Sequence, residues 1–83
     1  MNLYVGNLSY TMSEGELSNT FGEYGEVTSA RLVMDRETGR PRGFGFVEMA
    51  DKSAGLNAID ALHNKEINGR RIVVNEARAR ASR

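Results

Sequence analysis

The stretch RGFGFVEM, residues 42–49, places two phenylalanines, Phe44 and Phe46, two positions apart and alternating with glycines. Successive side chains of a β-strand point to opposite faces of a sheet. A strand over these residues therefore puts both rings on one face together with Arg42. The glycines, Val47 and Met49 occupy the other face.

Phenylalanines at this spacing commonly form half of a buried face. Here Val47 and Met49 make the better core stripe, so we expect both rings to face solvent. Flat rings beside a fixed cation suit unstacked bases beside phosphate, because every base has a π-face and every nucleotide a negative charge. The Gly43–Gly45 pair is a weak match to a dinucleotide loop, since it lacks the third glycine and leads into a strand.

The length and composition exclude several classes of protein. A chain of 83 residues forms one small domain. It has no cysteine and only one histidine, His63, so we expect neither disulfides nor a metal site. No apolar run approaches the ~20 residues of a membrane span, and the first residues lack the pattern of a signal peptide. We therefore expect a soluble, intracellular protein.

The formal net charge is zero, but the charges are unevenly distributed. Residues 1–30 carry four glutamates and no basic residue, whereas residues 70–83 carry five arginines and one glutamate. Nine of the eleven basic residues are arginine, the type that stacks on bases and binds phosphate with two donors. An ordinary solvent-exposed surface without a binding role would also explain this uneven distribution of charge. A neutral chain is expected to bind single strands moderately and with clear salt sensitivity.

The apolar periodicity predicts four strands and two helices. Ser13 and Glu16 form a capping box at the start of the first helix. Leu17, Phe21 and Tyr24 follow at helical spacing, and Gly25 is expected to end the helix. The strands are expected over residues 2–6, 27–34, 42–49 and 71–75.

Asp51 or Ser53 is expected to cap the start of the second helix. Turns are expected at residues 63–64 and 68–69, and residues 77–83 read as a basic, mobile tail. The residues expected on the inner side of this helix are Ala54, Ala58, Ile59, Ala61 and Leu62.

The order β-α-β-β-α-β predicts an α+β fold of the ferredoxin-like type, with a four-stranded antiparallel sheet and two helices on one face. The other face stays open to solvent. Exposed aromatic side chains gathered on one face indicate an interaction site. By alternation, the open face carries Tyr4, Arg31, Val33, Phe44, Phe46, Val73 and Asn75.

With this strand order and aromatic face, the chain resembles the RNA recognition motif family. The family's octamer is K/R-G-F/Y-G/A-F-V-x-F/Y, and RGFGFVEM departs from it only at Met49. Met49 has the alternation of a core residue, so this departure concerns packing rather than binding. The hexamer LYVGNL, residues 3–8, matches the companion motif of the first strand, and the likeness extends over residues 1–78.

The resemblance implies a role for each matching residue. Tyr4 and Phe46 should stack on neighbouring bases, Phe44 should pack against the sugars between them, and Arg42 should pair with a phosphate. Arg31 and Val33 should flank this surface. The positions at the end of the last strand and just after it, where the family reads base edges, are Val73, Asn75, Ala77 and Arg78.

The resemblance implies a non-catalytic binder of single-stranded RNA, with tolerance for single-stranded DNA and with no cofactor, membrane or small-molecule substrate. We expect a monomer with an RNA recognition motif at residues 1–78 and a tail at residues 79–83. The chain looks like the small single-domain RNA-binding proteins of bacteria, cyanobacteria especially. That likeness implies a cytoplasmic location, or a nuclear or organellar one in a eukaryote.

Two alternatives belong to other functional classes. Some domains of this fold bind proteins through a sheet or helix face, although such variants usually lack the stacking aromatics. Acylphosphatases share the strand order but need a phosphate-binding loop with an arginine. Here the loop over residues 7–12 contains neither arginine nor glycine, and the sequence offers no paired acid and base.

Overall fold

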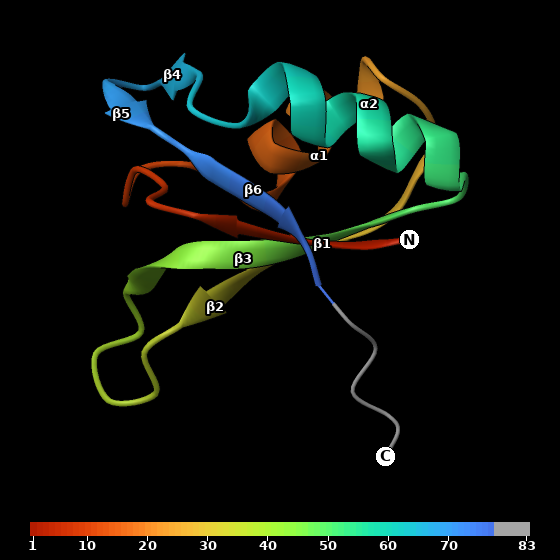
Figure 1. Ribbon diagram of the computed structural model, residues 1–83. Coiled ribbons are helices and arrows are strands. Elements are labelled where there is room, and N and C mark those ends of the chain that lie inside the picture. Colours follow the sequence, from red (N-terminus) through yellow and green to blue (C-terminus); the bar gives the residue numbers. More distant parts are fainter. Residues whose placement is uncertain (78–83) are drawn as a thin grey trace.

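The computed structural model describes residues 1–77 and has the expected β-α-β-β-α-β order, with one short hairpin added. In this part of the chain, two helices cover one face of a four-stranded sheet, and neither lies on the opposite face (Figure 1). The elements are β1 (Asn2–Gly6), α1 (Glu14–Gly22), β2 (Val27–Met34), β3 (Pro41–Met49), α2 (Lys52–Leu62), β4 (Glu66–Ile67), β5 (Arg70–Arg71) and β6 (Val73–Glu76).

The sheet has the strand order β2-β3-β1-β6, and every neighbouring pair is antiparallel. The two motif strands, β1 and β3, therefore lie side by side at the centre. Tyr4 is paired with Phe46 in their register, and Leu3 with Val47. Directly opposed residues point to the same face, so the predicted division of the two strands into a core face and an open face is confirmed.

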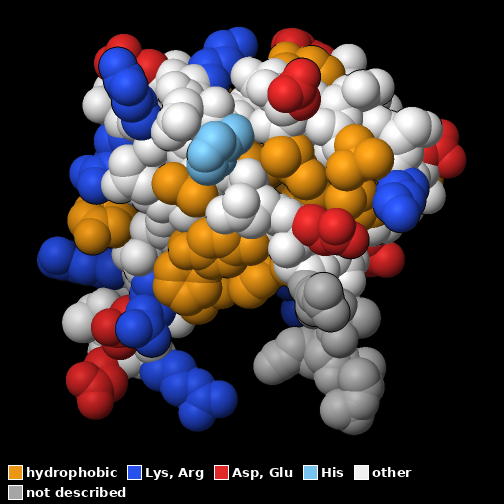
Figure 2. Space-filling view, in the orientation of Figure 1, with side chains coloured by type: hydrophobic (Ala, Val, Ile, Leu, Met, Phe, Trp, Pro, Cys, Tyr) orange, Lys and Arg blue, Asp and Glu red, His pale blue; other side chains and the backbone are white. Residues whose placement is uncertain are grey.

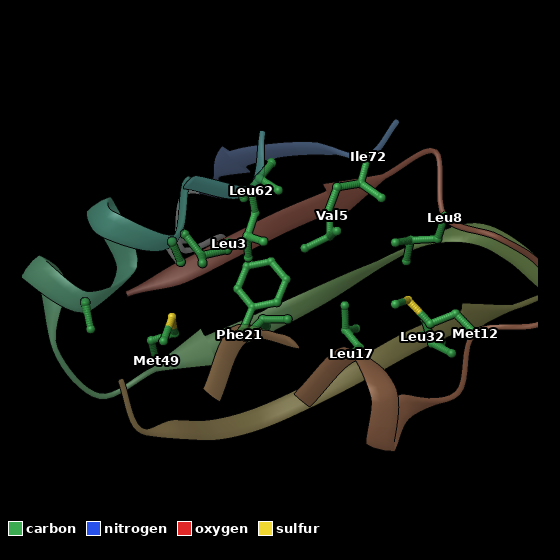
Figure 3. Packing of buried hydrophobic residues seen from close by; sticks show 14 residues of the cluster. Leu3, Val5, Leu8, Met12, Leu17, Phe21, Leu32, Met49, Leu62 and Ile72 are labelled. Atoms are coloured by element: carbon green, nitrogen blue, oxygen red, sulfur yellow. The ribbon is translucent and has the colours of Figure 1, made fainter. Parts of the chain in front are cut away.

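The core lies between the sheet and the helices. The ring of Phe21 on α1 lies at its centre, among apolar side chains from the strands and from α2 (Figure 3). Leu3 and Val47 are almost fully buried there, and so is Met49, as its alternation predicted. The buried hydrophobic residues of this core are Leu3, Val5, Leu8, Met12, Leu17, Phe21, Leu32, Val47, Met49, Ala54, Ala58, Leu62, Ile72 and Val74.

Helix α1 begins as predicted but ends earlier. The capping box is present: the Glu16 N–H donates to Ser13 Oγ at 3.1 Å, and the Ser13 N–H donates to Glu16 Oε1 at 3.0 Å. The helix ends at Gly22 rather than at Gly25. Gly25 serves close packing instead, because a Cβ at this position would collide with Ala54 of α2.

Helix α2 differs from prediction in two details. Asp51 occupies the N-cap position, but its side chain makes no capping hydrogen bond. Ala61 is exposed, so its expected place on the inner side is wrong. The inner side includes Gly55 instead, where a Cβ would collide with the side chain of Met1. Gly55 thus makes room for Met1, the residue before β1.

The expected last strand, residues 71–75, is divided into two. Ile72 separates β5 from β6, and β6 extends to Glu76. Strand β5 pairs with β4 in a short hairpin, where only a turn was expected. Asn68 (φ 53°) and Gly69 (φ 83°) both have positive φ, as a type I′ hairpin turn requires.

Two side chains at helix ends accept hydrogen bonds from backbone N–H groups of the edge strands β2 and β6. Glu14, the first residue of α1, accepts the Leu32 N–H of β2 at 3.0 Å. His63, which follows α2, accepts the Val74 N–H of β6 through Nδ1 at 3.1 Å. Unpaired N–H groups at sheet edges can pair with another chain, so these two side chains protect the edges of the sheet.

Gly45 of the octamer allows β2 and β3 to approach each other. A Cβ here would collide with the carbonyl oxygen of Arg31 and lie 3.2 Å from the Cα of Leu32. Both atoms belong to the β2 backbone, which cannot move aside as a flexible side chain would. The glycine is therefore required by packing.

We expect Gly45→Ala to lower the free energy of unfolding by about 1–3 kcal/mol, as overpacking does. Gly22→Ala is the matched control, because Gly22 is helical and has no neighbouring atom within 4 Å of the added Cβ. Alanine there should be neutral or stabilising by up to about 1 kcal/mol. Urea denaturation followed by circular dichroism measures both. Equal stabilities of the two variants would contradict this account.

Candidate nucleic-acid interface

Three aromatic rings form a cluster on the open face of the sheet. Tyr4 comes from β1, and Phe44 and Phe46 come from β3. The centroid of the Tyr4 ring lies 5.9 Å from those of both phenylalanines, which are 6.3 Å from each other. We call these three side chains the aromatic platform. Neither helix of residues 1–77 covers it, so the predicted outward orientation of the rings is confirmed.

The rings differ in exposure and in tilt. Phe46 is 42% exposed, whereas Tyr4 and Phe44 are half-buried. The planes of Phe46 and Tyr4 meet at 65°, and those of Phe44 and Phe46 at 86°. Because the rings are not parallel, each offers its own surface to solvent. Hydrophobic side chains gather at the level of the sheet, with Lys and Arg groups beside them (Figure 2).

The strand register extends the platform into a row across the whole sheet. Phe46 is opposite Tyr4 on one side and Arg31 of β2 on the other. Tyr4 is in turn opposite Asn75 of β6. A cation, two rings and an amide thus share one line on the open face, and both Arg31 and Asn75 are exposed.

The Tyr4 ring lies along β1 and over Gly6. A Cβ built on Gly6 would lie 2.7 Å from the Tyr4 hydroxyl oxygen and 3.1 Å from Cζ. This contact explains why Gly6 is buried although it lies in the strand at the open face. The glycine of the hexamer motif therefore makes the space in which the ring lies against the sheet.

The other predicted site residues lie around the platform. Val33 and Val73 are half-buried, and Ala77 continues the pairing of β6 with β1 through its N–H, which donates to the Asn2 carbonyl at 2.8 Å. Arg78 lies outside the described residues. Arg42 is exposed on β3. Gly43 has a φ of +89°, which interrupts regular strand alternation, so alternation alone does not place Arg42 on the same face as Phe44.

Sequence reasoning missed the role of Asn7, which joins the end of β1 to the β4–β5 hairpin. Its amide Nδ2 donates to the Arg71 carbonyl at 2.6 Å. Its Oδ1 accepts two hydrogen bonds from Arg70, from Nη2 at 2.7 Å and from Nε at 3.2 Å. Asn7 also has a φ of +56°, a conformation that asparagine tolerates better than most residues. The sequence signal for this role was an asparagine directly after the predicted first strand, because asparagine tolerates positive φ.

The described residues offer no assembled metal site and no membrane-spanning helix. Among residues 1–77, no three His, Asp or Glu side chains gather as a metal ion would require. Neither helix of this part of the chain is long and apolar enough to cross a membrane. His63 follows the end of α2, as predicted, and its Nδ1 is occupied by the Val74 N–H.

Comparisons with known proteins agree with the geometry. The family model described as RNA recognition motif matches residues 3–73. The Nostoc sp. protein RbpE, which carries the name of an RNA-binding protein, is 54% identical over 80 residues, which are 96% of this chain and 81% of the relative.

Two solved structures show the same fold. The crystal structure of the RNA-binding protein PG1 is similar with a TM-score of 0.91 and 53% identity, over 93% of each chain. An Sxl-lethal protein/RNA complex is similar with a TM-score of 0.87 and 37% identity, over 92% of this chain and 47% of that one. Because the family model covers most of the sequence and both motifs lie on the central strands, this chain belongs to the RNA recognition motif family.

Proposed function

We propose that this protein binds single-stranded RNA on the open face of its sheet, without catalysing a reaction. The observation that carries the proposal is the aromatic platform, three rings on two adjacent central strands that neither described helix covers. A stacked base is worth about 1–3 kcal/mol on such a ring. Family membership, the name of the Nostoc relative and the RNA in the Sxl-lethal complex support the same function.

The tilt of the rings favours single strands over duplexes. Neighbouring bases in a duplex are parallel and about 3.4 Å apart along each strand. Tyr4 and Phe46 are 5.9 Å apart, and their planes meet at 65°. Two bases stacked on these rings would therefore be splayed away from each other, which an unpaired strand allows.

Each residue around the platform has a proposed role. Phe46 and Tyr4 stack on two bases, and Phe44 packs against the sugars between them. Arg42 pairs with a phosphate, and Arg31 and Val33 flank the strand on β2. The proposed contacts to base edges come from β6 and the residues after it, namely Val73, Asn75, Ala77 and Arg78, the last of which lies outside the described residues.

The stacking and phosphate contacts do not require a 2′-hydroxyl, so we propose that single-stranded DNA also binds. We further propose that the protein acts as a monomer in the cytoplasm, and that residues 1–78 are the binding domain. The competing function is a protein-interaction module. The exposed rings favour nucleic acid, because their row also contains Arg31 and Asn75, a cation and an amide suited to phosphates and base edges.

We expect Phe46→Ala and Tyr4→Ala each to weaken RNA binding by about 1–3 kcal/mol, roughly 5- to 150-fold in Kd, because each removes one stacking surface. Fluorescence anisotropy with a labelled random-sequence single-stranded RNA measures the change. Leu56→Ala is the control, because Leu56 is 47% exposed on α2, away from the platform. Wild-type Kd values for both platform variants would refute the stacking surface.

We expect Gly6→Ala to weaken binding through the pose of Tyr4, because the added Cβ displaces the ring from the sheet. Stability should change little, since the colliding atoms belong to the far end of a side chain. The double variant with Tyr4→Ala is the control, because Gly6→Ala should have no further effect on affinity once the ring is absent. Additive losses from the two substitutions would show that Gly6 does not act through Tyr4.

A further inference from the structure

A second exposed aromatic lies outside the aromatic platform. Tyr10, in the loop between β1 and α1, is 65% exposed. Together with Arg40 and Pro41 it lines a hollow of about 400 Å³. Neither the sequence motifs nor the proposed function accounts for this residue.

The position of Tyr10 is fixed by the residues on either side of it. Leu8 and Met12 are both buried in the core, so the loop between them is anchored at two points. The Leu8 N–H donates to the Gly43 carbonyl at 2.8 Å, and the Met12 N–H donates to the Ser9 carbonyl at 3.1 Å. Tyr10 is therefore held outward on a short, tied loop.

Gly43 brings the Tyr10 ring against β3. A Cβ at Gly43 would lie 3.2 Å from Cε1 of Tyr10 and 3.6 Å from the Leu8 carbonyl oxygen. The φ of +89° at this residue also favours glycine. Gly43 directly precedes Phe44, so the Tyr10 ring lies beside the strand that carries two rings of the platform. The first glycine of the octamer thus lies between the Tyr10 ring and the aromatic platform.

The loop that carries Arg40, between β2 and β3, is also held by hydrogen bonds. The Asp35 N–H donates to the Arg40 carbonyl at 2.7 Å, and the Arg40 N–H donates to Thr38 Oγ1 at 3.3 Å. The Asp35 carboxylate accepts the N–H groups of Glu37 and Thr38. The loop before β3 is thus closed by its own hydrogen bonds, and these hold the backbone of Arg40 while its exposed side chain stays available.

We infer that Tyr10, Arg40 and Pro41 form an additional nucleotide site, used by the same RNA strand that occupies the platform; this inference rests on the proposed function. An exposed ring and an arginine that line the same hollow match a base and its phosphate. Pro41 and Phe44 are three residues apart on β3, roughly 10 Å in an extended strand. Even at the ~3.4 Å rise of a stacked strand, about three nucleotide steps span this separation. A splayed strand needs fewer steps, so one strand reaches both sites.

The test uses two labelled random-sequence single-stranded RNA pools, of 2 and of 10 nucleotides, and measures their Kd by anisotropy. A dinucleotide with both bases stacked on the platform leaves no nucleotide for the additional site. Tyr10→Ala should weaken binding of the long pool about 5- to 150-fold, the loss of one stacked base, and change the short pool less than about 2-fold. Tyr10→Phe keeps the ring and should keep the affinity. Arg40→Ala should also weaken binding of the long pool alone. The loop should keep its structure in this variant, because the hydrogen bonds of residue 40 come from its backbone.

Phe46→Ala separates the two hypotheses in the same experiment. If it weakens both pools while Tyr10→Ala and Arg40→Ala leave both unchanged, the additional site is wrong and the proposed function stands. An equal loss on both pools from Tyr10→Ala would also overturn the additional site, because the ring would then support the platform rather than a separate nucleotide. If Phe46→Ala changes neither pool, the proposed function itself fails.

Discussion

Side-chain alternation along the two central strands, combined with helices on only one face, is the constraint on which the site depends. Leu3 and Val47 face the helices and are almost fully buried, whereas their neighbours Tyr4 and Phe46 face solvent. A slip of one residue in the pairing of β1 with β3 would exchange these sets. It would bury a tyrosine hydroxyl and expose the core, so the packing that stabilises the fold also fixes the orientation of the rings.

Glycines and short polar contacts adapt this framework to binding. Gly45 lets the backbone of β2 approach β3, and Gly6 leaves the space in which Tyr4 lies on the sheet. Asn7, which follows Gly6, ties the end of β1 to the β4–β5 hairpin. The glycines of the two motifs are therefore explained by specific close contacts, and these contacts determine the shape of the binding surface.

The sequence predicted what depends on local periodicity: the strand faces, the capping box of Ser13 and the place of Met49 in the core. It could not predict features that depend on how distant segments meet. Gly25 was expected to end the first helix. Instead, its lack of a side chain lets it pack closely against Ala54 of α2. The place of Tyr10 beside Gly43 likewise depends on a tertiary contact, and the left-handed Gly43 limits what alternation says about Arg42.

The central claim is that RNA lies on the platform rather than on the helices. The most direct measurement is an NMR titration of isotope-labelled protein with single-stranded RNA that follows the aromatic and methyl signals. This account predicts intermolecular NOEs and the largest shift changes at the rings of Tyr4, Phe44 and Phe46, with the methyl groups of Leu56 on α2 unchanged. Contacts at Leu56 with unperturbed platform rings would contradict it.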